Sequence, residues 1–271
     1  MGAVISRNRI QKLCIIAAAF ACICGVMYYQ AAATASRSVV FSDADHVTLS
    51  ILTGDGVLET TLWRAENGAG YFFLPSCADL ADCCFLYDDT DCSLELGEKE
   101  IAAGTFLSAF RPEVPYAFRF RDRDGTILQD TVTFLQSAGL PAVYLQTEDA
   151  ALDYVHADKE NKAKASMTIV DASGKIVYRD AIAYIKGHGN TSWTDQEKKP
   201  YLLKLKEPFP LLGMGSGNKW ILLANAYDPS YIRNSLVYDL AQSVGLPYTS
   251  QLRYVDLYIN GEYRGNYQLA E

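Results

Sequence analysis

The sequence Tyr-Ile-Lys-Gly-His-Gly-Asn-Thr-Ser-Trp at residues 184–193 leads from an apolar segment into a glycine-rich loop. Residues 181–186 are predicted to form a strand, and the two glycines that follow predict a loop whose backbone N–H groups a ligand can approach closely. Lys186 adds a positive charge beside them, and this combination is typical of a phosphate site. An ordinary turn has the same composition, so the loop alone leaves both interpretations open.

Further strands are expected on both sides of this loop, each bounded by turn residues. Lys204 lies in the next strand among apolar neighbours. A strand lysine behind a glycine-rich loop is the arrangement with which kinases hold phosphates, and an exposed lysine on an edge strand is the alternative. The expected strands are Ala142–Thr147, Lys164–Val170, Lys175–Tyr178, Ala181–Lys186, Tyr201–Leu205 and Trp220–Leu223.

One helix is expected after these strands. Asp228 is a good N-cap, Pro229 suits the first helical position, and apolar residues recur at helical spacing until Gly245 ends the helix. Asp239 lies on the other face of this helix. It is a candidate acidic partner of Lys204, or else a solvated helix-face carboxylate.

The final element is a hairpin in which Arg253–Ile259 and Glu262–Ala270 flank Asn260-Gly261, the strongest two-residue hairpin signal. The sequence ends on Glu271, directly after the return strand. We therefore expect the domain to be incomplete at this point.

Several blocks in this order carry a family resemblance. They are residues 184–193, 198–205, 211–215, 219–225, Asp228, Arg233-Asn234, 245–248 and 260–267. Over residues 141–271 the chain resembles the N-terminal portion of the CotH (spore coat protein H-like) atypical protein kinases. The resemblance implies a mainly antiparallel-sheet, kinase-like N-lobe with one main helix. With the β-sandwich-like domain that strand and turn patterns predict before it, the expected fold class is α+β.

The same resemblance implies ATP and Mg²⁺ as cofactors, and Ser or Thr of coat or extracellular proteins as the phosphorylated groups. The residues it implies for nucleotide binding are Lys186, Gly187, His188, Gly189, Asn190, Lys204 and Asp239. No catalytic residue or metal ligand is expected in this sequence, because those carboxylates lie further along the family's chains. The alternative function is a non-catalytic spore-coat or cell-surface protein that uses the same fold for structure or binding.

One position departs from the family pattern. His188 stands between the two glycines, where the family commonly has arginine. Arginine offers a permanent forked charge to a phosphate, whereas histidine is mostly neutral near pH 7. We therefore expect weaker or pH-dependent phosphate binding.

Residues 37–140 read as a β-sandwich-like domain of short strands and frequent turns, either a spacer or a binding module. It carries four cysteines that allow three pairings into disulfides, and no C-x-x-C spacing that would favour zinc. These cysteines are Cys77, Cys83, Cys84 and Cys92. The kinase-like lobe is expected over residues 141–271.

Residues 1–36 are expected to be a signal peptide or a membrane anchor. Three basic residues precede the apolar segment 13–29, and Ala33-Thr34-Ala35 resembles a cleavage site. Either outcome places the body outside the cytoplasm, secreted or anchored to the membrane by residues 13–29. The net charge of −8 makes nucleic acid an unexpected partner.

Overall fold

The computed structural model describes residues 47–271 apart from 66, 89 and 149–150. The export segment expected at residues 1–36 lies outside this range. Among the described residues, no helix is both long and apolar enough to cross a membrane.

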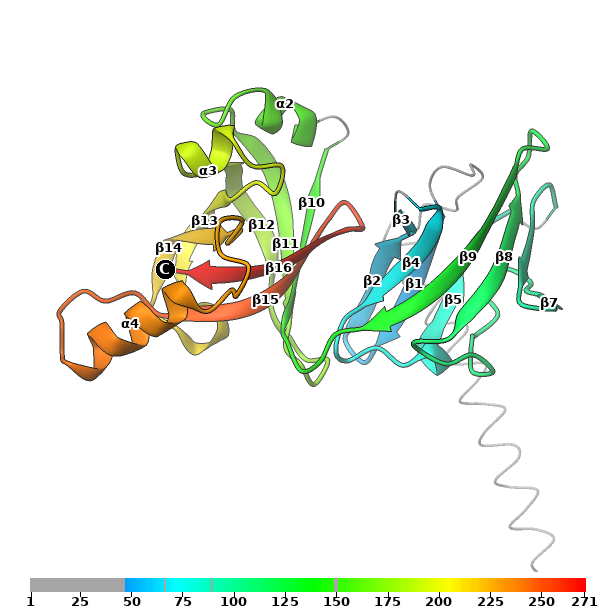
Figure 1. The fold of residues 1–271 in the computed structure, drawn as a ribbon, viewed down its shortest axis with the longest axis horizontal. Helices are drawn as coiled ribbons and strands as arrows, with labels where there is room; N and C mark the ends of the chain where they lie inside the picture. The colour runs from blue at the N-terminus through cyan, green and yellow to red at the C-terminus, as the bar shows by residue number, and fades with distance from the viewer. Residues whose placement is uncertain (1–46, 66, 89, 149–150) are drawn as a thin grey trace, which may run out of the picture. The chain divides into compact units, whose positions relative to one another are not determined.

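The first half of the described chain forms two sheets around one apolar core (Figure 1). One sheet has three strands in the order β2-β1-β5, and the other has six in the order β3-β4-β9-β8-β6-β7. The strands are β1 (Thr48–Thr53), β2 (Gly56–Thr61), β3 (Trp63–Arg64), β4 (Ala69–Leu74), β5 (Cys83–Phe85), β6 (Ser93–Leu96), β7 (Lys99–Glu100), β8 (Pro115–Arg121) and β9 (Ile127–Gln136), with the short helix η1 (Leu80–Asp82) before β5.

Aromatic side chains fill the space between these two sheets. Phe72 on β4 stacks on Phe134 of β9 at a ring distance of 5.6 Å and meets Phe85 of the other sheet at 5.4 Å. Successive residues of a strand point to opposite faces, so the buried phenylalanines leave their strand neighbours on the outer face. Cys83 and Cys92 are buried free thiols in this half, and Cys77 is a half-buried one, so no disulfide joins these three.

The second half is a closed barrel of seven strands in the order β10-β11-β12-β13-β14-β16-β15. Figure 1 shows these strands wrapping around one core, with the short helices α2 and α3 near one end. The elements are β10 (Ala142–Thr147), α2 (Ala151–Ala157), β11 (Ala163–Val170), β12 (Ile176–Gly187), α3 (Thr191–Thr194), β13 (Tyr201–Phe209), η2 (Leu211–Gly213), β14 (Gly217–Leu223), α4 (Arg233–Ser243), β15 (Leu252–Ile259) and β16 (Glu262–Ala270).

The expected fold class, an α+β chain with a kinase-like lobe of antiparallel strands and one main helix, is wrong. Strands dominate, and the sheet closes because β10 pairs in parallel with β15, from Ala142 opposite Asp256 to Leu145 opposite Ile259. Closure removes the exposed sheet edges that an open sheet would keep. It also encloses a core that includes Trp220, fully buried on β14.

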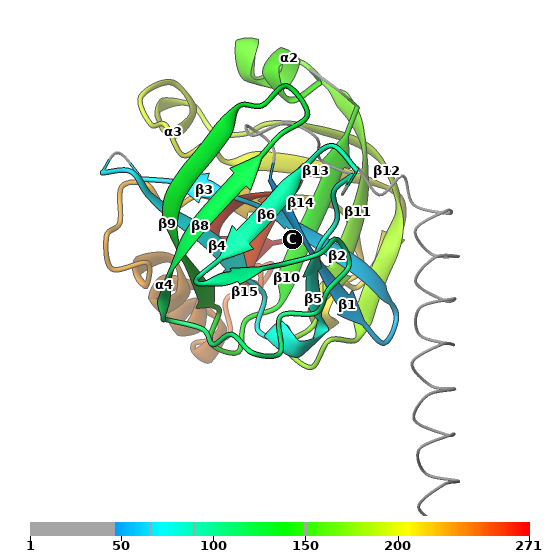
Figure 2. The ribbon, with the colours of Figure 1, turned by 90° about the vertical axis from the view of Figure 1, so that its right-hand side faces the viewer.

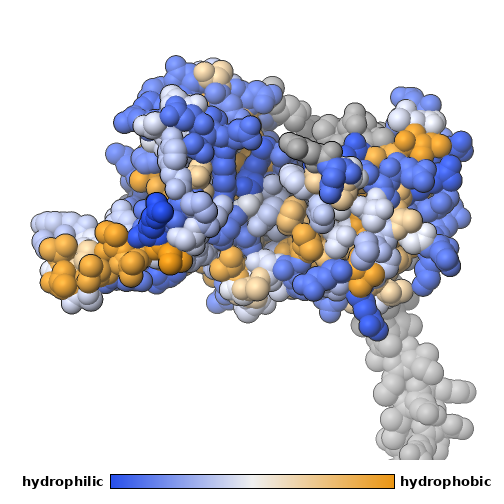
Figure 3. Space-filling view, in the orientation of Figure 1, coloured by the Kyte–Doolittle hydropathy of each residue, from blue (hydrophilic) through white to orange (hydrophobic). Residues whose placement is uncertain are grey.

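Helix α4 starts later than its sequence pattern predicts. It begins at Arg233, and Asp228 lies in the preceding turn, where one carboxylate oxygen accepts the Arg233 N–H at 2.9 Å. The apolar side chains of the helix face outward, with Leu236 66% and Leu240 61% exposed. They form an apolar surface over α4 that Figure 3 shows as a continuous hydrophobic area.

Candidate functional site: a lysine-rich face of the barrel

Strand register places three lysines on the outer face of the barrel. Lys204 on β13 lies opposite Tyr184 on β12 and opposite Lys219 on β14. Its strand neighbours Leu203 and Leu205 are fully buried, so the lysine points away from the core. Lys186 lies two residues after Tyr184 and shares this outer face, as a diagonal neighbour of Lys204.

We call Lys162, Lys186, Lys204 and Lys219, grouped around Tyr184, the lysine face. The ammonium of Lys162 lies over the Tyr184 ring at 4.8 Å. Lys186 donates to Glu160 at 2.6 Å. The ion pairs within 4.0 Å in the described part of the chain include no acidic partner for Lys204 or Lys219. The face therefore carries positive charge that the surrounding protein does not neutralise.

The glycine-rich loop adjoins this face at the end of β12. Lys159 donates to the Asn190 side-chain oxygen at 2.8 Å and to the Gly189 carbonyl at 3.2 Å. The His188 backbone N–H donates to the Pro200 carbonyl at 3.1 Å. Burial, together with the charges of Lys186 and Lys159, lowers the pKa of His188. His188 is therefore neutral at pH 7, and the loop's positive charge comes from the lysines.

Packing explains both glycines of the loop. A Cβ on Gly187 would lie 2.8 Å from the Lys159 Cα and 2.8 Å from the Trp193 ring, and one on Gly189 would lie 2.3 Å from the Ser192 hydroxyl. Gly189 also has a left-handed φ of +82°. Sequence reasoning attributed these glycines to the approach of a ligand, and the structure supplies a reason within the protein.

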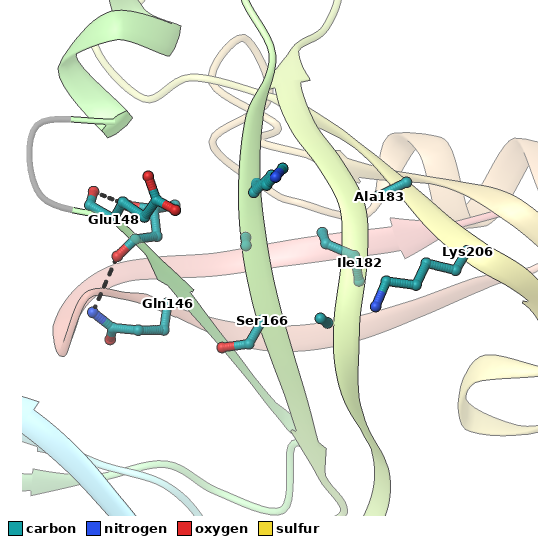
Figure 4. A pocket seen from close by; sticks show the side chains of 10 residues that line it. Gln146, Glu148, Ser166, Ile182, Ala183 and Lys206 are labelled. Carbon is teal, nitrogen blue, oxygen red and sulfur yellow. Dashed lines mark hydrogen bonds between the residues drawn. The ribbon is translucent and has the colours of Figure 1, made fainter. Parts of the chain in front are cut away.

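A groove of about 460 Å³ borders the lysine face on the outside of β10, β11 and β12. Figure 4 shows Gln146 and Ser166 on one side of it and Lys206 on the other. Lys206 follows Lys204 by two residues on β13 and lies 4.0 Å from Asp180, a long ion pair on the surface. The groove therefore continues the outer surface of the barrel beyond the lysine face, and apolar atoms make up most of its lining.

The structure does not bring Asp239 to Lys204. Asp239 is exposed on α4, and no ion pair among the described residues joins the two. Sequence reasoning also missed Lys162 and Lys219. Lys219 directly precedes the expected strand Trp220–Leu223, but only the register between β13 and β14 shows that it faces Lys204.

Metal-ligating side chains do not cluster in the described residues. No group of three or more His, Cys, Asp or Glu residues there could hold a metal ion. The side chains present therefore suit a polyanion, and they do not fit Mg²⁺ on their own.

Fold and site together define a β-barrel with a lysine-rich outer face. Residues 185–271 match the profile of the CotH family, described as CotH kinase protein. The matched segment contains Lys186, Lys204 and Lys219 and begins at the end of β12. A search of curated proteins found no match.

Proposed function

We propose that the protein is a CotH-like atypical kinase that binds ATP on the lysine face and phosphorylates Ser or Thr of coat or extracellular proteins. The observation that supports this is the pair Lys204 and Lys219, which face each other on neighbouring strands without an acidic partner among the described residues. Two adjacent unpaired ammonium groups repel each other, and a bound phosphate chain relieves that repulsion.

Three lysines would hold the phosphates. Lys186, Lys204 and Lys219 point from three adjacent strands, which lie about 4.8 Å apart. Leu202 and Ile221 lie opposite each other on the same outer surface and are half-buried, so they offer apolar contact beside the charges. When bound, ATP would supply the phosphoryl group, and this chain's residues would bind and orient it.

Mg²⁺ belongs to the proposed reaction, but the described residues provide no cluster of ligands for it. The transfer step is therefore not assigned to residues of this chain. The proposed protein substrates and the export through residues 1–36 follow from the family match at residues 185–271 and from the basic and apolar N-terminal sequence.

Titration calorimetry of the full chain with ATP, with and without Mg²⁺, tests the binding. We expect the double substitution Lys204→Ala and Lys219→Ala in one chain to weaken ATP binding by at least about tenfold, which corresponds to about 1.4 kcal/mol of binding free energy. The control is Lys175→Ala, which removes an exposed lysine from the turn between β11 and β12 of the same barrel. Absence of ATP binding, or equal loss in the control, contradicts the proposal.

Phosphoryl transfer needs a separate measurement. We expect the full chain to transfer labelled phosphate from ATP to a mixture of coat or extracellular proteins, and Lys204→Ala to reduce that transfer. If ATP binds but no transfer occurs, the second candidate is favoured. That candidate is a non-catalytic coat or cell-surface protein, and the neutral His188 in the loop supports it.

A further inference from the structure

The six-stranded sheet presents an outer face that the proposed kinase function does not use. Register aligns Trp63 of β3 with Tyr71 of β4, and Tyr71 with Thr133 of β9. Gly70 and Phe72 flank Tyr71 on β4, and both are buried and point into the core. Trp63 and Tyr71 therefore lie side by side on the outside, with ring centroids 5.9 Å apart and Trp63 38% exposed.

The same outer face carries a polar groove of about 520 Å³, whose lining residue Thr131 lies two residues before Thr133 on β9. Its floor is the next two rows of outward residues across β9, β8 and β6, strands that Figure 2 shows side by side. One row places Thr131 opposite Ala117, and the other places Gln129 opposite Arg119 and Arg119 opposite Glu95. The residues that line the groove include Glu95, Ala117, Arg119, Gln129, Asp130 and Thr131.

The charges in the groove are already paired within the protein. Arg119 lies 3.8 Å from Glu95, and Arg64 lies 3.3 Å from Asp130. Arg119 and Glu95, the charged residues of these two outward rows, offset each other, in contrast to the lysines of the lysine face. A charged ligand would find no unbalanced partner here, whereas a neutral ligand with many hydroxyl groups could hydrogen-bond to the planar side chains of Gln129, Arg119 and Glu95.

We propose that this outer face binds a neutral polysaccharide built of pyranose rings. The apolar face of a sugar ring packs on an aromatic ring, which is large, rigid and costs little conformational entropy on binding. Trp63 and Tyr71 provide two such rings in one row, and the groove on the same outer face provides hydrogen-bonding groups at the spacing of neighbouring strands. Ala117 and Gly97 also line the groove, and their small size leaves it open.

Co-sedimentation of the full chain with insoluble cellulose and with insoluble chitin tests the proposal. We expect retention on at least one of them, weakened about tenfold or more by Trp63→Ala and by Tyr71→Ala, each the equivalent of losing one stacking contact. Gln129→Ala removes a fully outward polar group and serves if the aromatic variants unfold; it is expected to weaken retention severalfold. Tyr154→Ala, which removes a 56% exposed tyrosine from α2, is the control.

Salt separates a neutral ligand site from an ionic one. Because the groove's charges are paired, we expect retention to persist at about 1 M NaCl, where the screening length is only ~3 Å. Absence of retention on both glycans overturns the proposal. So does retention that high salt abolishes, or that Trp63→Ala, Tyr71→Ala and Gln129→Ala leave unchanged.

Discussion

Replacing Gly187 with alanine separates the two reasons for a glycine in the loop. The new Cβ would lie 2.8 Å from the Lys159 Cα and 2.8 Å from the Trp193 ring. Carbon atoms in favourable contact are about 3.5–4.0 Å apart, so both neighbours would have to move. Trp193 is 7% exposed and Lys159 presents its backbone, so neither can move freely.

The expected cost follows from overpacking. Forcing an extra methyl group into a packed site costs about 1–3 kcal/mol. For a folded region of this size, each kcal/mol lowers the melting temperature by roughly 2–4 °C. Gly187→Ala should therefore lower the urea midpoint and the melting temperature, measured by tryptophan fluorescence of the full chain. Gly54→Ala is the matched control, because nothing lies within 4 Å of its new Cβ and its φ is not left-handed.

ATP binding gives the result that decides between the two reasons. If packing explains the glycine, folded Gly187→Ala protein well below its melting temperature binds ATP about as tightly as the unsubstituted chain. If the variant keeps its urea midpoint but no longer binds ATP, the packing argument is refuted, and the glycine is needed for the close approach of the ligand. A destabilised Gly54→Ala would show that the assay reports methyl addition in general rather than the contact at Gly187.

Three further outcomes are expected. Burial lowers the pKa of both His156 and His188 below the ordinary value of 6.5. The unfolded chain therefore binds more protons than the folded chain, and the urea midpoint should fall as the pH falls below about 6.5. A flat urea midpoint between about pH 7 and 5.5 contradicts this. Trp220→Ala should cost about 3–5 kcal/mol of unfolding free energy, since the ring is fully buried in the barrel core, and a urea midpoint near that of the unsubstituted chain contradicts it. Leu240→Lys on α4 should leave the urea midpoint nearly unchanged, because that side chain is 61% exposed, and a large loss of stability contradicts it.

Local patterns predicted most strands of the barrel but not its closure. The hairpin around Asn260-Gly261 forms where its turn residues predict it, with Ile259 opposite Glu262. Turn chemistry acts over a few residues, and so a single sequence can show it. The parallel pairing of β10 with β15 joins segments more than a hundred residues apart, and no local pattern encodes it. The prediction of a kinase-like lobe with a mainly antiparallel sheet was wrong because no local pattern encodes this pairing.

The helix boundary was misplaced for a different reason. Asp228 has the side chain of an N-cap and does accept the Arg233 N–H, but it does so from a turn that precedes the helix. Tyr231, between them, has a left-handed φ of +58°, which interrupts helical geometry. A capping side chain predicts that a helix starts nearby, whereas the backbone between it and the helix depends on tertiary contacts such as the one from Tyr254 to the Tyr231 carbonyl.

The candidate site was only partly predictable, because a lysine in a sequence does not show what lies opposite it. Lys186 and Lys204 could be chosen from the loop and the strand. Whether their charges are left unpaired depends on Lys219 across the β13–β14 pair and on Glu160, which neutralises Lys186. The same reasoning separates the two proposed surfaces. On the sandwich sheet, Arg119 is paired with Glu95, while Lys204 and Lys219 on the barrel have no acidic partner among the described residues. Unbalanced charge favours a polyanion, and balanced charge beside aromatic rings favours a neutral polyhydroxyl chain, so the pairing of charges, rather than their number, distinguishes what each face can bind.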